Sequence, residues 1–206
     1  MTLTAVVTGG SGGIGKEVVR GLRARSWDVT SLSRREGTDV SDEKDVLKAF
    51  ARLKSLDALV HCAQVLIKRP FTRLTAEEWD QQISSGLRGA FLCSREAFKL
   101  MRRRGGSIVF VSSLSGVFGV EKFPGMAAYV AAKSGLAGLT EVLAVEGRER
   151  GIRVNAISPG SVDTPMLRTA GVQGPALQPA EVARIIAWLV SPESAPLSGA
   201  NLRMDP

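Results

Sequence analysis

Short apolar runs alternate with longer amphipathic segments along the whole chain. Leu3–Thr8 is an apolar run that ends in glycines, as is typical of a strand buried on both faces of a sheet. Ile14–Arg25 follows it, with its apolar side chains at helical spacing. The same patterns predict further strands at Asp28–Leu32, Ala58–Cys62, Ser107–Ser112, Ile152–Ile157 and Ala200–Met204, and further helices at Asp42–Leu53, Ala76–Arg104 (broken near Gly86 or Gly89), Ala127–Arg150 and Pro179–Leu189.

This alternation predicts an α/β fold, a doubly wound parallel sheet of six main strands in a single domain over residues 1–206. A parallel crossover needs about a dozen residues. The segment from Arg35 to Asp39 is too short for one, so no helix is expected between residues 34 and 40. Thr38–Val40 should be at most a short extended segment. Such a sheet binds ligands at the carboxyl ends of its strands.

Composition narrows the class of protein. Hydrophobic residues make up 44% and charged residues 23%, as in globular proteins, which excludes a disordered chain. The net charge of +7 suits an anionic partner, but basic residues are not interleaved with aromatic ones, so we expect no nucleic acid. Arg102–Arg104 should cap a helix C-terminus.

Location and metal binding follow from a few residues. The sequence contains no run of 18 apolar residues, so no membrane span is predicted. Cys62 and Cys93 lie in apolar surroundings and are expected to be reduced, which favours a cytoplasmic protein. His61 is the single histidine and has no carboxylate or cysteine set around it, so no metal site is expected.

A glycine-rich loop joins the first predicted strand to the first predicted helix. Its sequence is Thr8-Gly9-Gly10-Ser11-Gly12-Gly13-Ile14-Gly15. Glycines let the backbone approach a pyrophosphate, and a helix N-terminus supplies free N–H groups and a positive dipole end. The loop therefore predicts a phosphate site at Gly9, Ser11, Gly13, Ile14 and Gly15; the alternative is a merely flexible loop.

Tyr129 and Lys133 share one face of a predicted helix because they are four residues apart. An ammonium beside a phenol should lower the tyrosine pKa toward working pH and make Tyr129 a proton donor to a carbonyl oxygen. Ser113 follows a strand and could donate to the same oxygen, with Ser112 and Ser115 as rivals. The alternative is a set of ordinary helix and loop residues.

The residues after the second predicted strand favour a phosphorylated cofactor. Arg34 and Arg35 lie 19 and 20 residues after Gly15, where a dinucleotide fold places the group that contacts the adenosine ribose. With Ser33 they offer a hydroxyl and two cations to a 2′-phosphate. The prediction is NADP(H), with NAD(H) as the alternative cofactor. If these residues have no role in cofactor binding, they form an ordinary solvated basic turn.

These motifs, in this order and over nearly the whole chain, resemble the short-chain dehydrogenase/reductase family. The resemblance implies a Rossmann-type fold and hydride transfer between a carbonyl and an alcohol of a small molecule. It also implies that Ser113, Tyr129 and Lys133 are catalytic, and that members pair through their long helices, here as a homodimer or homotetramer. Further cofactor contacts implied by the resemblance are Asp39, Val40, Ala63, Tyr129, Lys133, Pro159, Val162 and Thr164.

The sequence departs from the family in several places. The family's Asn-Asn-Ala-Gly is His61-Cys62-Ala63-Gln64, and its active-site Asn, which helps hold a water for the lysine, aligns with Gly86. The substrate lid between Thr164 and Pro179 is short. A longer stretch before Tyr129 contains Phe118, Val120 and Phe123, which form either an apolar wall or simple loop packing. These departures leave open a cofactor-binding sensor or partner-binding module with little catalysis.

Overall fold

The computed structural model describes residues 2–101 and 105–205, and within them six strands form one parallel sheet. The strands are β1 (Thr4–Thr8), β2 (Asp28–Leu32), β3 (Ala58–His61), β4 (Gly106–Val111), β5 (Ile152–Pro159) and β6 (Asn201–Met204). Every neighbouring pair is parallel, and the order is β2-β1-β3-β4-β5-β6. The predicted α/β class and the six strands are confirmed.

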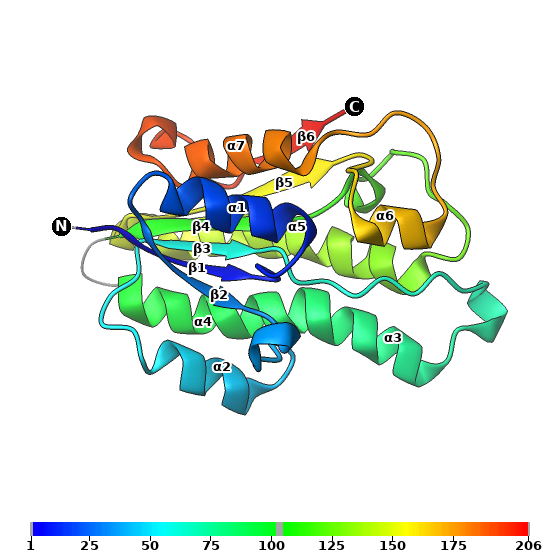
Figure 1. Cartoon of the computed structure of the whole chain (residues 1–206), viewed down its shortest axis with the longest axis horizontal. Coiled ribbons are helices and arrows are strands. Elements are labelled where there is room, and N and C mark those ends of the chain that lie inside the picture. Colours follow the sequence, from blue (N-terminus) through cyan, green and yellow to red (C-terminus); the bar gives the residue numbers. More distant parts are fainter. Residues whose placement is uncertain (1, 102–104, 206) are drawn as a thin grey trace.

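Helices cover both faces of the sheet (Figure 1). They are α1 (Gly13–Arg23), α2 (Glu43–Phe50), α3 (Ala76–Ile83), α4 (Gly89–Met101), α5 (Ala127–Gly147), α6 (Pro165–Ala170) and α7 (Pro179–Leu189). On one face α1 and α7 bury Val18, Leu22 and Ile186 against the strands. On the other, α2, α4 and α5 bury Phe50, Leu92 and Leu136. The sheet therefore lies between two apolar cores, as a doubly wound fold requires.

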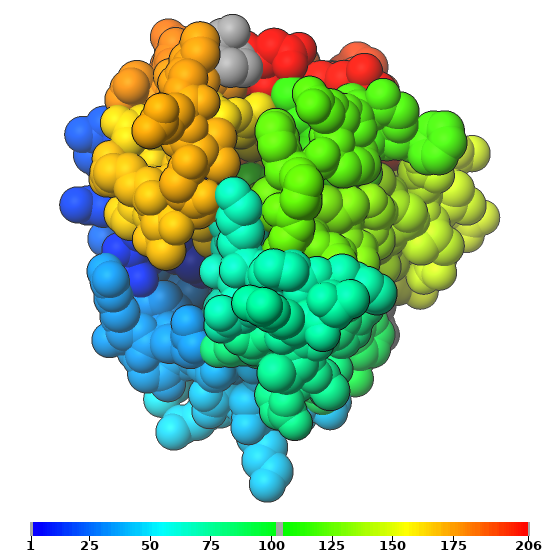
Figure 2. Space-filling model, turned by 90° about the vertical axis from the view of Figure 1, so that its right-hand side faces the viewer, coloured from blue at the N-terminus to red at the C-terminus, as the bar shows by residue number. Residues whose placement is uncertain are grey.

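The strand order places a cleft at one edge. The chain moves outward from β1 to β2 and then returns to β3 on the other side of β1, so the loops after β1 and β3 separate at the carboxyl edge. Figure 2 looks onto this edge, where the surface is hollowed between the blue N-terminal loop, the segment around α6 and the loop before α3.

A tight turn follows β2 directly, and the crossover helix α2 begins only at Glu43. Arg34–Glu36 forms a single 3-10 turn that ends at Gly37, whose φ is 80°. The carbonyl of Ser33 accepts hydrogen bonds from the N–H groups of both Glu36 and Thr38, at 2.9 Å each. The expectation that no crossover helix fits here is confirmed, because the segment holds only this single 3-10 turn, which is shorter than the two helical turns that would contradict it. No two-turn helix and no further strand is present there.

The long helix predicted for Ala76–Arg104 is interrupted where glycines were expected to break it. α3 ends at Ile83, a π-turn covers Ser84–Arg88, and α4 begins at Gly89. The expected capping role of Arg102–Arg104 falls outside the described residues.

The segment Ala127–Arg150, made of α5 and a 3-10 turn, has the length and mean hydropathy (1.2) of a membrane span, and core helices meet the same criteria. Here it packs on β5 and α3 and carries the buried Lys133. Val142 and Val145 on its outer side are exposed.

Candidate active site

One cavity of about 670 Å³ opens at the carboxyl edge of the sheet. Every site residue predicted from the sequence lines it. From the loops after β1 and β2 these are Gly9, Ser11, Gly13, Ile14, Gly15, Ser33, Arg34, Arg35, Asp39 and Val40. From the remaining elements they are Ala63, Ser113, Tyr129, Lys133, Pro159, Val162 and Thr164.

The glycine loop is shaped by close backbone approach. Gly9 has φ 67°, and a Cβ there would lie 2.9 Å from the backbone nitrogen of Ala63. A Cβ at Gly15 would collide with the carbonyl oxygen of Gly9, so only glycine lets α1 begin this close to β1. Gly12 is the N-cap of α1, no side chain caps the helix, and the space around its Cβ position is open. The first turn of α1 is therefore accessible to an anion.

Side chains at the end of β2 carry charges of both signs. Arg34 and Arg35 line the cavity, as predicted. The Ser33 hydroxyl, however, donates to the Glu36 carboxylate at 2.5 Å, and the Ser31 hydroxyl donates to the same oxygen at 2.8 Å. No sequence motif marks Glu36, because only the tight turn folds its side chain back onto the strand.

Asp39 lies on the same side of the cavity. Burial raises the pKa of its carboxyl, but hydrogen bonds from Ser41 and the charge of Arg34 outweigh burial and hold it below its ordinary value. Arg34 thus already faces one carboxylate of the protein.

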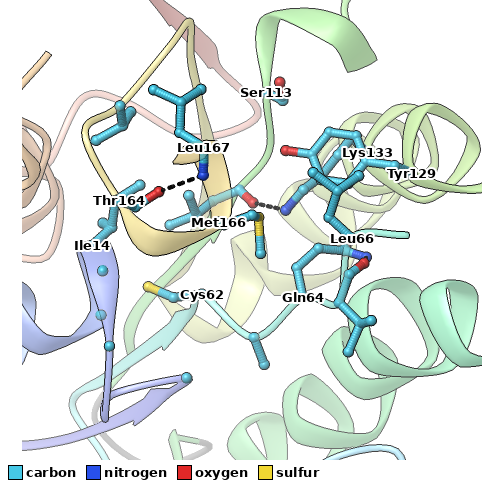
Figure 3. A pocket seen from close by; sticks show the side chains of 18 of the residues that line it. Ile14, Cys62, Gln64, Leu66, Ser113, Tyr129, Lys133, Thr164, Met166 and Leu167 are labelled. Carbon is cyan, nitrogen blue, oxygen red and sulfur yellow. Dashed lines mark hydrogen bonds between the residues drawn. The ribbon is translucent and has the colours of Figure 1, made fainter. Parts of the chain in front are cut away.

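Ser113, Tyr129 and Lys133 meet on the other side of the cavity (Figure 3). Lys133 Nζ lies 5.5 Å from the centre of the Tyr129 ring and donates to the carbonyl oxygen of Val111 at 2.7 Å. Ser113 begins a 3-10 turn, where its Oγ accepts from the N–H of Ser115 at 3.2 Å.

The structure distinguishes between the serines proposed for the site. The Ser112 hydroxyl is buried and donates to the backbone carbonyl of Lys133 at 2.8 Å, so it fastens α5 to β4. Ser113 instead has a hydroxyl that faces Tyr129 and reduces the rise of the tyrosine pKa. This favours Ser113 over Ser112 as the group that would contact a substrate oxygen.

The predicted lowering of the Tyr129 pKa is wrong for the chain by itself. Burial raises this pKa, and the hydrogen bond with Ser113 offsets only part of the rise. Burial also lowers the pKa of Lys133 to about 8. Desolvation shifts the pKa values of both groups toward their neutral forms. The lysine cation does not reverse this shift, because it lies beside the tyrosine ring and makes no hydrogen bond to the phenol oxygen. The phenol is therefore protonated at neutral pH.

His61 and Cys62 end β3 beneath this group. His61 Nδ1 pairs with Thr8 Oγ1 at 2.9 Å, and its Nε2 pairs with the carbonyl oxygen of Gly86 at 2.8 Å. Burial, with the charge of Lys133, lowers the histidine pKa to about 3, so the ring is neutral. Burial raises the Cys62 pKa to about 12, and both cysteines are free thiols. In residues 2–101 and 105–205 no cluster of three His, Cys, Asp or Glu could hold a metal.

The outer part of the cavity is apolar. Val120 and Phe123 line it, as the wall hypothesis predicted, whereas Phe118 is 99% exposed and does not. Sequence reasoning missed the other wall residues, since no motif marks them: Val65, Leu66, Leu114, Met126, Met166, Leu167, Ala170 and Val172. Lys68 donates to the carbonyl of Ala170 at the end of α6, at 3.3 Å.

A parallel sheet with a glycine loop between β1 and α1, and an open cavity beside it, defines a dinucleotide-binding α/β protein. The family model described as "Enoyl-(Acyl carrier protein) reductase" matches residues 28–206. The chain belongs to the short-chain dehydrogenase/reductase family and is an oxidoreductase of the class acting between CH–OH and C=O groups.

Relatives with different substrates match the chain. It is 38% identical over 165 residues to a trans-4-hydroxycyclohexanecarboxylate dehydrogenase of Sinomonas cyclohexanicum, covering 76% of this chain but 62% of that protein. It is 32% identical over 231 aligned residues to the 3-oxoacyl-[acyl-carrier-protein] reductase FabG of Rickettsia bellii (strain RML369-C), covering 98% of this chain and 95% of the relative. A ligand-free aldohexose dehydrogenase structure from Thermoplasma acidophilum superposes with a TM-score of 0.91 at 25% identity, covering 99% and 92% of the two chains.

Proposed function

We propose that the protein is an NADP(H)-dependent reductase that converts the carbonyl group of a small apolar molecule to an alcohol. The observation that carries the proposal is the grouping of Ser113, Tyr129 and Lys133 in the same cavity as the glycine loop and Arg34. A phosphate site and a proton donor in one cavity fit hydride transfer better than binding alone.

The residues present fit a nicotinamide dinucleotide. The open space over Gly12 and the uncapped first turn of α1 would receive the pyrophosphate. Arg34 and Arg35 would hold a 2′-phosphate, which would compete with Asp39 for Arg34 and with Glu36 for the Ser33 hydroxyl. Thr164, whose Oγ1 caps α6 by accepting from Leu167 N at 3.3 Å, would lie against the carboxamide end.

Each catalytic side chain has a task that follows from its surroundings. When bound, the cofactor supplies the hydride. Ser113 donates a hydrogen bond to the carbonyl oxygen as negative charge develops on it. Tyr129, whose raised pKa keeps it protonated, donates the proton to that oxygen. Lys133 remains a cation below pH 8, and its charge stabilises the phenolate that the donation leaves.

The apolar outer wall indicates the substrate class. Val120, Phe123 and Met166 would contact the substrate, and Glu121 is the charged residue on that side besides the catalytic lysine. An uncharged ketone or aldehyde with an apolar body fits this wall, because the Glu121 carboxylate would repel an anionic substrate.

The test is a reductase assay with NADPH and a panel of cyclic, aryl and 3-oxoacyl thioester carbonyl compounds. We expect NADPH consumption with the apolar ketones and tighter binding of NADPH than of NADH. Tight NADPH binding without turnover on the whole panel would instead establish the binding-module alternative. Equal affinity for the two cofactors would overturn the NADP(H) assignment.

We further propose that the protein is a cytoplasmic homodimer or homotetramer that pairs through α4 and α5. Phe91 on α4 and Val142 and Val145 on α5 are exposed, and an uncovered apolar face of this kind favours association. Light scattering at micromolar concentration tests this, and a monomer mass would refute it.

A further inference from the structure

The segment after β3 lines the cavity but belongs to no strand or helix. Val65 and Leu66 lie in this segment and form part of the apolar wall. A partly buried backbone N–H group needs an acceptor, and an irregular segment has no neighbouring strand to supply one. Side chains supply it here. Ser85 Oγ accepts from the N–H of Val65 at 3.0 Å. Gln82 Oε1 accepts from the N–H of Ile67, also at 3.0 Å.

Gln82 is itself held in place on α3. It is 1% exposed, and its Nε2 donates to the carbonyl oxygen of Glu78, one helical turn earlier, at 3.2 Å. Its backbone carbonyl accepts from Ser85 Oγ at 3.3 Å and from Gln64 Nε2 at 3.1 Å. A buried carboxamide whose oxygen and nitrogen are both hydrogen-bonded holds its partners in one geometry.

The glycine of the π-turn lets the segment come this close to α3. A Cβ at position 86 would coincide with Gln64 Oε1 and lie 2.9 Å from Gln64 Cδ. The Gln64 carboxamide thus occupies the space in which a side chain at position 86 would begin. A side chain there would push the segment away from the two residues that hold it.

Beyond Leu66 the segment is fastened to the other walls of the cavity. Lys68 Nζ donates to the carbonyl of Ala170 at the end of α6, and the N–H of Arg69 donates to Gly125, in the loop after β4, at 2.9 Å. α6 and that loop carry most of the other apolar wall residues. The segment is therefore held at both ends, and its position is set by the rest of the wall.

Leu66 lies between the two amides that Ser85 and Gln82 hold. Figure 3 shows its side chain on the same side of the cavity as Tyr129 and Lys133. The Tyr129 hydroxyl must lie within hydrogen-bond reach of a substrate carbonyl, so an apolar side chain beside it determines where the body of the substrate can lie.

We propose that Gln82 and Ser85 are positioning residues that set substrate specificity, because they hold Leu66 against the apolar body of the carbonyl compound. This rests on the proposed function. Both residues act through the backbone of Val65–Ile67 and not on the reacting atoms. Their loss should therefore weaken the binding of large substrates and leave cofactor binding and the chemical steps unchanged.

The experiment measures kcat and KM for a graded series, made of the carbonyl compound that the wild type reduces fastest and analogues with a progressively shorter apolar body. Gln82→Met keeps the length of the side chain but removes the acceptor of the Ile67 N–H. It should raise the KM of the largest substrate about tenfold, near the lower end of what a fitted apolar pocket contributes to discrimination, and that of the smallest by less than about twofold. The KM for NADPH should not change. Gln81→Met, at the exposed neighbouring glutamine, is the matched control and should behave as the wild type.

A second pair of variants tests the other hydrogen bond. Ser85→Ala removes the acceptor of the Val65 N–H and should shift specificity in the same direction, whereas Ser85→Thr keeps the hydroxyl and the wild-type preference. Hydrogen exchange of the amides in residues 64–68 should become faster in Gln82→Met and in Ser85→Ala. Ser85 is only half-buried, so Ser85→Ala decides the outcome if Gln82→Met does not fold.

A double variant tests whether Gln82 acts through Leu66. Leu66→Ala should by itself reduce the preference for large substrates. Gln82→Met should then add little in the double variant, because the contact that it controls is already lost. Additive losses would show that Gln82 acts elsewhere and would overturn the inference.

Other outcomes also overturn it. Active Gln82→Met and Ser85→Ala variants with the wild-type preference along the series remove this inference and leave the proposed function standing. A loss that is equal for all substrates and comes with weaker NADPH binding assigns the two residues a structural role only. A wild type that reduces no carbonyl compound removes the proposed function and this inference with it.

Discussion

The two sides of the cavity are built in different ways. On the β1–β2 side, the glycine loop is backbone, and its shape depends on absent side chains at Gly9 and Gly15. On the β3–β4 side, the site depends on side chains: His61 and Gln64 donate to carbonyls of the distant segment Gln82–Gly86. Substitutions should therefore damage the first side by adding atoms and the second by removing hydrogen-bonding groups.

The largest expected effect is on the β3–β4 side of the cavity, where side chains build the site. Tyr129→Phe removes the one phenol of the chain and should lower kcat by about 10²–10⁴, the usual contribution of general acid catalysis. Steady-state turnover with NADPH measures this, and NADPH affinity by fluorescence titration is the control, which should stay near the wild-type value. Unchanged turnover would mean that the proton comes from elsewhere.

The second prediction uses pH to probe the same side. The His61 pKa is lowered from 6.5 to about 3 in the folded chain, so between these values the unfolded chain binds a proton that the folded chain does not. The contribution of the neutral His61 ring to the free energy of unfolding is therefore fully present above pH 6.5. It is lost as the pH drops, with a slope that approaches about 1.4 kcal/mol per pH unit.

Urea unfolding at pH 7, 6 and 5 measures this loss. His61 is the only histidine and the carboxyls titrate lower, so the slope over this range belongs to His61. A His61→Asn variant should show a flat profile from pH 7 to 5. A wild type with constant stability there would contradict the buried neutral ring.

The third prediction compares substitutions at two glycines of the loop on the β1–β2 side of the cavity. Gly15→Ala should lower the free energy of unfolding by about 1–3 kcal/mol, because the added methyl group meets the carbonyl of Gly9. Gly12→Ala should leave stability within about 0.5 kcal/mol but weaken NADPH binding, because its methyl group enters open space at the cavity. Thermal unfolding and NADPH titration of both variants test the split; equal stabilities would show that close packing does not fix the loop.

The smallest effect concerns the charges after β2. Arg34→Ala should weaken the binding of NADPH about tenfold, since a charge-assisted hydrogen bond contributes about 1.5–3 kcal/mol. It should change the binding of NADH little. Glu36→Gln should act in the opposite direction by a few-fold, because it removes the carboxylate that holds Ser33. Titration of both cofactors measures each change. If Glu36→Gln weakened NADPH, its carboxylate would not compete with the phosphate.

The sequence by itself determined the helices and strands, and the glycine loop on the β1–β2 side of the cavity. Apolar periodicity and the run Thr8–Gly15 are local signals, because a strand, a glycine loop and a helix start depend on neighbouring residues. The number of strands was predictable for the same reason. The five residues after Arg34 are too few for a parallel crossover, so no further strand fits there and the sheet has six. Tyr129 and Lys133 were also found by local spacing.

Only the tertiary structure decided how the side chains share space. The Tyr129 pKa is set by burial, which no spacing reports, and it moved opposite to the prediction. Glu36 folds back through a turn that its neighbours only partly specify. Gln64 and Gly86 looked like two unrelated losses until the fold brought them into one volume. Desolvation and van der Waals exclusion act between residues that are distant in the chain, so only the folded structure determines their outcome.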